Sequence, residues 1–91
     1  MLTMNIDYKK DSELLKALGH PIRLKMVEGL LRHECNVKKI VGALGLPQST
    51  ISQHLGVLKN KGVVTVRKEG VKTCCRVTDK KVEALLKVLG Q

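Results

Sequence analysis

The stretch VKKIVGALGLPQSTISQHLGVLKNKG, residues 37–62, decides the fold of this chain. Its first part has apolar residues at helical spacing, namely Val37, Ile40, Val41 and Leu44. Gly45 ends this helix by offering a left-handed C-terminal position, and Pro47 begins the next helix with its φ angle already set. The stretch therefore predicts two short helices joined by a tight turn at Gly45-Leu46-Pro47.

The second helix of this stretch, expected at about residues 48–60, has one apolar and one polar face. The apolar stripe consists of Ile51, Leu55 and Leu58. The outward-facing residues are Gln48, Ser49, Ser52, Gln53 and Lys59. A rigid helix pair that exposes Gln, Ser and Lys, rather than Glu-Lys ladders, suits a DNA major groove. We therefore interpret the stretch as a helix-turn-helix whose recognition helix is residues 48–60.

The composition narrows the possible partners. The 91 residues form one domain, 1–91, with a core too small to enclose a substrate cleft. Lys and Arg number 17 against 8 Asp and Glu, and the net charge of +9 favours polyanions, among them DNA, RNA or an anionic membrane face. A ribosomal protein or a nonspecific nucleic-acid-binding protein can have the same small size and positive charge, so this alternative stays open. One Tyr with no Phe or Trp argues against binders that stack bases on aromatic rings, so duplex DNA is the favoured partner.

Targeting signals are not evident in the sequence. No run of about 18 apolar residues exists, so no membrane partner is expected. The start, MLTMNIDYKKDS, lacks the apolar centre of a signal peptide. Three cysteines, an odd number, predict free thiols in a reducing compartment, and hence a cytoplasmic protein.

The residues before the helix-turn-helix predict two further helices. Residues 1–8 are expected to form a flexible arm. Asp11 or Ser12 is expected to cap a helix that ends at Gly19, and Pro21 begins another.

The residues after the helix-turn-helix predict a hairpin and a last helix. Residues 63–78 are β-branched and alternating, interrupted by Lys68-Glu69-Gly70, which indicates two strands with a basic tip. Asp79 is expected to cap a helix within residues 79–91. The predicted fold is mainly α with a small β-hairpin, a winged helix-turn-helix of about five helices plus a wing.

Three segments carry a resemblance to a known family. ALGHPIRLKMVEGL, QSTISQHLGVLKNKGVV and RKEGVKTCCRVTD resemble the ArsR/SmtB family of bacterial and archaeal repressors. The resemblance covers residues 14–89, and its most specific parts run from Ala17 to Leu24 and from Ser49 to Leu55. It implies a homodimer built on the first and last helices, with recognition helices in successive major grooves. It also implies an effector whose binding weakens the hold on operator DNA.

Contacts to DNA are assigned by side-chain chemistry, since amides pair with adenine edges and hydroxyls suit either base. The candidates for base contacts are Gln48, Ser49, Thr50, Ser52, Gln53 and His54. For His54, a contact to DNA and a structural hydrogen bond both remain open. The candidates for phosphate contacts are Lys38, Lys39, Lys59, Lys61, Arg67, Lys68 and Lys72. Any single lysine can equally be a solvated surface charge, and the wing tip is the best candidate.

The last helix predicts the dimer interface, because an apolar stripe left over on so small a domain is usually covered by a second subunit. The expected interface residues are Leu14, Leu18, Val82, Leu85, Leu86 and Leu89. Packing of the last helix on the first within one chain is the alternative.

The two common metal sites of the family are expected to be absent. Metal-sensing members carry a Cys-Val-Cys-Asp type motif at the start of the third helix. The corresponding residues here are Asn36, Val37, Lys38 and Lys39. The second site requires Asp and His on the last helix, which has Asp79 and Glu83 but no His. We therefore predict no zinc at either place.

The three cysteines are candidate sensor residues. Cys35 precedes the third helix, while Cys74 and Cys75 lie on the returning strand of the wing. In a winged helix, the short segment before the third helix usually lies beside the returning wing strand, and neighbouring strands are about 4.8 Å apart. Cys35 can therefore approach one of the two strand cysteines. Only one of them is expected to face it, because adjacent strand residues point to opposite faces. Such thiols can form a disulfide or capture a thiophilic ion, arsenite or Cu(I). A plain role in the core is the alternative, because cysteine is among the most frequently buried residues.

The function predicted is a sequence-specific repressor that binds double-stranded operator DNA as a homodimer. Release by thiol oxidation or metalloid binding is the mechanism that the cysteines suggest. The alternatives are a winged-helix module for protein interaction and a nonspecific DNA-binding protein. An enzyme is not expected, because Ser49, Ser52 and His54 share one exposed helix without a nearby carboxylate partner.

Overall fold

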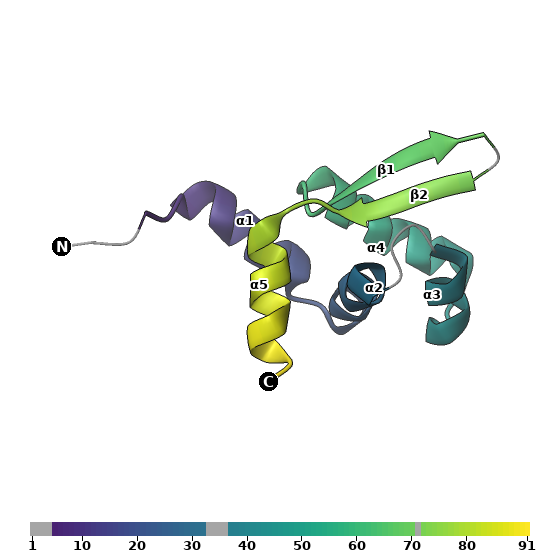
Figure 1. Cartoon of the computed structure of the whole chain (residues 1–91), viewed down its shortest axis with the longest axis horizontal. Coiled ribbons are helices and arrows are strands. Elements are labelled where there is room, and N and C mark those ends of the chain that lie inside the picture. The colour runs from purple at the N-terminus through teal and green to yellow at the C-terminus, as the bar shows by residue number, and fades with distance from the viewer. Residues whose placement is uncertain (1–4, 33–36, 71) are drawn as a thin grey trace.

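The structure, a computed structural model, describes residues 5–32, 37–70 and 72–91. Over these residues it contains five helices and one two-stranded antiparallel sheet. In chain order the elements are α1 (Tyr8–Leu18), α2 (Pro21–Arg32), α3 (Val37–Leu44), α4 (Gln48–Asn60), β1 (Val64–Glu69), β2 (Lys72–Val77) and α5 (Lys80–Leu89) (Figure 1). The predicted winged helix-turn-helix architecture is confirmed.

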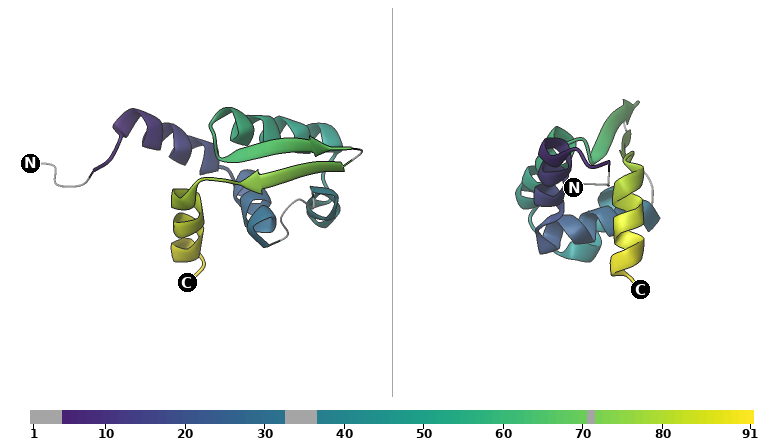
Figure 2. Two further views of the ribbon diagram at one scale, coloured as in Figure 1. Left: turned by 45° about the horizontal axis from the view of Figure 1, so that its top comes forward. Right: turned by 90° about the vertical axis from the view of Figure 1, so that its left-hand side faces the viewer.

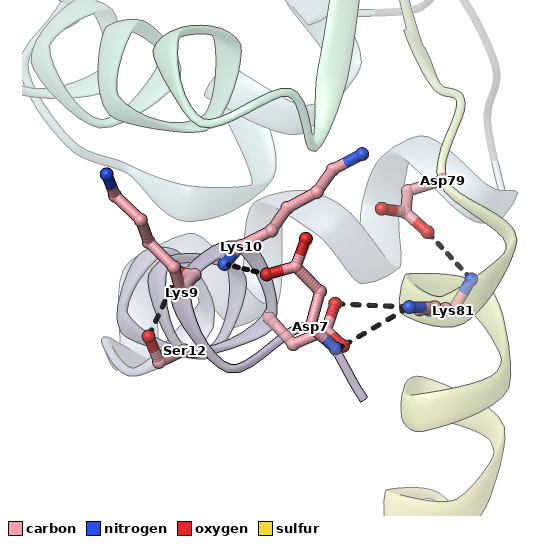
Figure 3. A network of polar contacts seen from close by, with 7 residues as sticks. Asp7, Lys9, Lys10, Ser12, Asp79 and Lys81 are labelled. Carbon is pink, nitrogen blue, oxygen red and sulfur yellow. Dashed lines mark hydrogen bonds and ion pairs between the residues drawn. The ribbon is translucent and has the colours of Figure 1, made fainter. Parts of the chain in front are cut away.

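Helix α1 begins earlier than the sequence suggested. Its N-cap is Asp7, whose side chain accepts a hydrogen bond from the backbone N–H of Lys10 at 3.1 Å (Figure 3). A reciprocal hydrogen bond joins Asp7 to Asp11, because Oδ2 of Asp11 accepts from the backbone N–H of Asp7 at 3.1 Å. The prediction of a cap at Asp11 or Ser12 was wrong, since the two carboxylates together satisfy the first turn. Tyr8 therefore belongs to α1 and not to the predicted arm.

The hydrophobic core lies where the first four helices meet the base of the hairpin. Its buried members are Leu14, Ala17, Leu18, Met26, Val27, Leu30, Ile40, Ile51, Leu58, Val63, Val64, Cys75 and Val82. Gly29 allows close packing of α2 on α3, because a Cβ there would lie 3.0 Å from the side chain of Ile40. Both apolar stripes of the helix-turn-helix thus contribute to the core, and this anchors the pair.

The hairpin alternates regularly between an inner and an outer face. Val66 pairs with Cys75 and Arg67 with Cys74 in the antiparallel register. Cys75 is buried, whereas Cys74 is half-buried and Arg67 is exposed, so the two cysteines belong to opposite faces of the sheet. Gly70 has a φ of 65° at the end of β1, as a tight hairpin turn requires.

Helix α5 is capped as predicted, because the Asp79 side chain accepts from the backbone N–H of Lys81 at 2.8 Å (Figure 3). Figures 1 and 2 show that α1 and α5 project from the body of the molecule, while the hairpin runs beside α4. In the part of the chain that the structure describes, no helix is long and apolar enough to cross a membrane.

Candidate nucleic-acid interface

The turn between α3 and α4 is fixed by backbone conformation. Gly45 has a φ of 64°, the left-handed conformation expected for a residue that ends a helix. Pro47 occupies the N-cap position of α4 rather than its first turn, and the N–H of Ile51 donates to its carbonyl at 3.2 Å. The predicted recognition helix at residues 48–60 coincides with α4.

Helix α4 has one face packed against the core and one face exposed to solvent. Ile51 and Leu58 are buried, and Leu55 is half-buried beside them. Four of the predicted base-contacting residues are exposed, namely Gln48, Ser49, Ser52 and Gln53. Their spacing of one and four residues places them on a single face of the helix. Thr50 is half-buried, and Lys59 is exposed in the last turn.

The start of α4 also presents backbone donors. Pro47 provides no side-chain cap, and the first turn contains no acidic residue. The leading N–H groups of a helix carry the positive end of its dipole, and they are suited to a phosphate group.

His54 has partners within the protein. Its Nδ1 atom lies 3.4 Å from Nη1 of Arg23, and its ring centroid is 4.5 Å from that of His20. Partial burial, the neighbouring His20 and Arg23 together lower the pKa of His54 below its ordinary 6.5. Its structural hydrogen bond is therefore observed, while a contact of His54 to DNA stays a prediction.

The wing presents basic residues beside the recognition helix. Arg67 and Lys68 on β1 are exposed. Lys72 begins β2, and its side chain lies outside the described part of the structure, as does that of Lys38. Lys61 follows α4, and its ammonium lies 2.8 Å from a carboxylate oxygen of Glu13 in α1. That hydrogen bond from Lys61 is the main reason why the pKa of Glu13 falls below its ordinary range.

The cysteines differ in their surroundings. Cys75 is fully buried and free, and burial raises the pKa of its thiol. Cys74 is half-buried and disulfide-bonded, and it faces the side of the hairpin that carries Arg67 and Arg76. Cys35 lies outside the described residues. Among the residues that are described, no group of three or more His, Cys, Asp or Glu side chains is arranged to hold a metal ion.

The apolar faces of α1 and α5 are only partly covered. Leu14, Leu18 and Val82, which the sequence assigned to the dimer interface, are buried within the protomer. Leu85 and Leu86 are half-buried, and Leu89 is 69% exposed. The large apolar side chains left exposed are Ile6, Tyr8, Leu15, Val88 and Leu89. The described chain therefore has an uncovered apolar surface on its two projecting helices.

Several important residues were not assigned a role from the sequence. Leu15 and Val88 are exposed apolar residues that the interface prediction omitted. Arg23 belongs to a segment that carries the family resemblance and was given no role of its own, yet its side chain contacts both α1 and α4. The sequence shows that His20, Arg23 and His54 occur in one small domain, but it does not show that they lie in contact. Only the fold brings them together.

Comparisons with known proteins agree with this geometry. The family model described as bacterial regulatory protein, arsR family, matches residues 20–66. The chain is 38% identical over 97 residues to the transcriptional repressor PagR of Bacillus anthracis, a match that covers 98% of this chain and 97% of PagR. The crystal structure of PagR has a TM-score of 0.82 to this chain at 41% identity, covering 90% of this chain and 94% of that one.

Two other solved structures are similar. HlyU from Vibrio cholerae has a TM-score of 0.84 at 34% identity, with 94% of each chain covered. A homodimeric winged helix-turn-helix DNA-binding domain from Mycobacterium bovis, described as a possible ArsR-family regulator, has a TM-score of 0.78 at 26% identity. It covers 99% of this chain and 87% of that one. The prediction that the chain is not an enzyme is confirmed, because these relatives are regulators, and the chain belongs to the arsR family of bacterial regulatory proteins.

Proposed function

We propose that the chain is a sequence-specific repressor of transcription that binds double-stranded operator DNA as a homodimer. The observation that carries this proposal is the exposed polar face at the start of α4, backed by the buried side chains of Ile51 and Leu58. Ser49 and Gln53 lie on that face, where an amide can pair with adenine and a hydroxyl can bond to either base. Gln48, Ser52 and Thr50 are the other base-contacting candidates.

Phosphate contacts are proposed on both sides of the recognition helix. Arg67 and Lys68 of the wing would reach the backbone flanking the groove, and Lys59 would lie nearer the helix end. The uncapped N–H groups at the start of α4 add a phosphate site that depends on no side chain. Lys72 remains a candidate by its place in β2. Lys61 is a weaker one, because Glu13 already neutralises it.

The homodimer is proposed to form through α1 and α5. Leu15, Val88 and Leu89 are each more than half exposed, and Leu85 and Leu86 lie beside them on α5. A second copy of the chain would remove this apolar surface from water. Leu14, Leu18 and Val82 would support the interface from within the core. Two-fold pairing would place the recognition helices about one DNA turn apart.

Selection from a random duplex library tests the proposal, because every possible operator sequence competes in one experiment. The purified protein should enrich an inverted repeat whose half-sites lie about 10 base pairs apart, centre to centre. Gln53→Ala should lose discrimination at one position of each half-site, by about 1–3 kcal/mol. Lys68→Ala should instead weaken binding to all sequences and reduce the salt slope by about one charge.

The control variant is Lys25→Ala, which removes an exposed charge from α2 at a residue that has no proposed contact with DNA. It should leave the selected motif and its affinity unchanged. Enrichment of no motif, together with salt-dependent binding to every duplex, would support a nonspecific binder. Failure to bind any duplex would support a protein-interaction module.

Release from DNA is proposed to involve Cys35 and Cys74 in this cytoplasmic regulator. Cys74 is disulfide-bonded, Cys75 is free and buried, and Cys35 is the only other cysteine in the chain. In β2, Cys74 shares a face with Arg76 and pairs with Arg67 on β1, and positive groups favour the thiolate form. An oxidant such as hydrogen peroxide would take two electrons from the two thiols, forming one disulfide and two waters.

Operator binding by the reduced and oxidised proteins tests this mechanism. Oxidation should weaken binding in the wild type and in Cys75→Ala, but not in Cys35→Ser or Cys74→Ser. Release by arsenite or Cu(I), with no response to oxidant, would identify the cysteines as a metalloid or metal site instead. A full response in the double variant Cys35→Ser, Cys74→Ser would show that these thiols are structural.

A further inference from the structure

Arg23 joins α1 to the recognition helix through its guanidinium group. Its Nε donates to the carbonyl of Ala17, and Nη2 donates to the carbonyl of Lys16 at 3.3 Å. These carbonyls belong to the last turn of α1, where intrahelical partners run out. The remaining Nη1 lies 3.4 Å from Nδ1 of His54, at the middle of α4. One side chain thus connects the end of α1 to the helix proposed to read DNA.

Both histidines of this cluster use Nδ1 as an acceptor. The backbone N–H of Ile22 donates to Nδ1 of His20 at 3.1 Å. A guanidinium group has only donors, so the contact of Arg23 with Nδ1 of His54 also requires an unprotonated nitrogen. The two rings lie 4.5 Å apart between centroids, inclined by 46°. The contact of Arg23 with His54 is complete only when the His54 ring is neutral.

Among the described residues, the groups that act on His54 are His20 and Arg23, and neither supplies a negative charge to stabilise a cation. The turn before α2 presents His20, and α2 presents Arg23. Helix α1 contributes the carbonyls that hold Arg23, while the ammonium of Lys16 is directed to Glu13 at 3.7 Å. Protonation of His54 would therefore place a second positive charge against Arg23 and remove the acceptor that it uses.

We propose that Arg23 is a positioning residue for the recognition helix, that it acts through neutral His54, and that acid weakens operator binding by breaking this contact. The inference rests on the proposed function, since it assigns a regulation to the same helix. His54 directly follows Gln53, so a shift of α4 at this point displaces a residue proposed to contact bases. Its position makes it sensitive to small movements.

The direction of the pH effect follows from the lowered pKa of His54. In the unfolded chain the imidazole of His54 titrates near 6.5, whereas in the folded protein, where Arg23 contacts it, the imidazole binds its proton only at lower pH. The stabilising contact is complete above about pH 6.5, and it is lost as pH falls from there through the lowered pKa. Operator binding should decline over the same window.

Two variants separate positioning from general packing. His54→Asn keeps an acceptor close to the position of Nδ1 but cannot take up a proton. Each protein is therefore compared with its own affinity at pH 7.5, and His54→Asn should lose less of that affinity than wild type loses between pH 7.5 and 5.5. Arg23→Lys keeps the charge but loses the fork that spans two carbonyls and the imidazole, so its affinity at pH 7.5 should fall about tenfold.

The matched control is Arg32→Lys, the same exchange at an exposed position of α2. It should leave both the affinity and its pH profile unchanged. The proposal would be overturned if Arg23→Lys bound like wild type, or if His54→Asn and wild type shared one pH profile.

A measurement on the free protein keeps this test separate from the proposed function. Titration of the His54 ring followed by NMR should give a midpoint below that of an unstructured histidine, and Arg23→Lys should move the midpoint upward. The protection of the α4 amides, measured relative to the intrinsic exchange rate at each pH, should fall at pH 5.5 in wild type and not in His54→Asn. If these changes occur and no duplex is selected, the contact between Arg23 and His54 acts as proposed and the DNA-binding proposal fails. If they do not occur, the proposed role of this contact is refuted whether or not DNA binds.

Discussion

The ammonium group of Lys81, in the first turn of α5, lies 3.1 Å from the carboxylate of Asp11 in α1. The two residues are 70 positions apart, and their ion pair joins the two helices whose apolar surfaces are exposed. Asp11 also accepts the backbone N–H of Asp7, so one carboxylate both completes the cap of α1 and holds the start of α5. This ion pair links the start of α1 to the start of α5 within one protomer.

Replacement of this carboxylate should make stability less dependent on pH in acid. The hydrogen bond from Lys81 is the main reason why the pKa of Asp11 lies below its ordinary 3.8. Its contribution is therefore complete above the unfolded pKa and is lost as pH falls through the folded one. In urea denaturation, Asp11→Asn should be less stable than wild type at pH 7, and the difference should narrow as pH falls below the ordinary 3.8.

The control for this prediction is Glu83→Gln. Glu83 pairs with Lys87 at 3.6 Å within the same exposed helix, and exposed pairs of this kind contribute little. Its effect at pH 7 should be smaller than that of Asp11→Asn. An equal loss in both variants would mean that the contact between the two helices has no special role.

Charged substitutions on the exposed apolar surface should separate the proposed dimer. Leu15→Glu and Leu89→Glu place a carboxylate at positions that are 56% and 69% exposed in the protomer. Neither should disturb the core, but both would bury a charge in the interface. Sedimentation velocity should show a shift from dimer to monomer. Lys87→Gln changes the charge of α5 by the same amount at an exposed site and should stay dimeric.

Circular dichroism distinguishes dissociation from unfolding in these variants. The helical signal of Leu15→Glu and Leu89→Glu should remain close to wild type under conditions where the dimer is lost. A dimer that survives both substitutions would exclude this surface as the interface, and α1 and α5 would need another partner.

Local sequence signals predicted much of the fold because single residues determine those features. Gly45 ends α3 with a positive φ, Pro21 begins α2, and Asp79 caps α5. The start of α1 was missed because Asp7 and Asp11 share the capping role, and a single-residue rule favours only one of them.

The candidate site was predicted as far as helical spacing reaches. The exposed face of α4 follows from periodicity, and the structure leaves Gln48 and Gln53 exposed there. The contact of Arg23 with His54 spans 31 residues and depends on how α1, α2 and α4 pack, which no local pattern encodes. The same limit applies to Leu15, because periodicity marks a residue as apolar without showing which side chains the protomer itself covers.

Cys75→Ser should destabilise the protein more than Cys74→Ser when both variants are compared in the reduced state. Cys75 is fully buried on the inner face of the hairpin, and a serine hydroxyl there would lose its hydrogen bonds to water. The expected loss is about 1–3 kcal/mol in the free energy of unfolding. Cys74 is half-buried, so serine remains partly hydrated. Denaturant titrations in excess reductant measure both.

The reactivity of the two thiols should follow the reverse order of their burial. Burial raises the pKa of the Cys75 thiol, which disfavours the reactive thiolate. In the folded, reduced protein, a thiol reagent should label Cys74 well before Cys75. Equal labelling rates would show that the inner face of the hairpin opens to solvent and that its packing does not protect the thiol.

Two glycine-to-alanine exchanges in and after α3 should change stability in opposite directions. Gly45 has a φ of 64°, so a Cβ there is strained although no atom lies within 4 Å of it, and Gly45→Ala should cost about 1–2 kcal/mol. Gly42 lies inside α3, is exposed and also has open space around its Cβ position. Gly42→Ala should stabilise by about 0.5–1 kcal/mol, because alanine is the better helix former.

Because each exchange adds one methyl group only three residues apart, the pair isolates backbone conformation from side-chain contact. Thermal and denaturant unfolding of both variants should bracket the wild type. Gly45→Ala should also weaken operator binding, since it strains the turn that sets α4 against α3, whereas Gly42→Ala should not. If both variants shifted stability in the same direction, the positive φ of Gly45 would not be the reason that alanine is unfavourable at this turn.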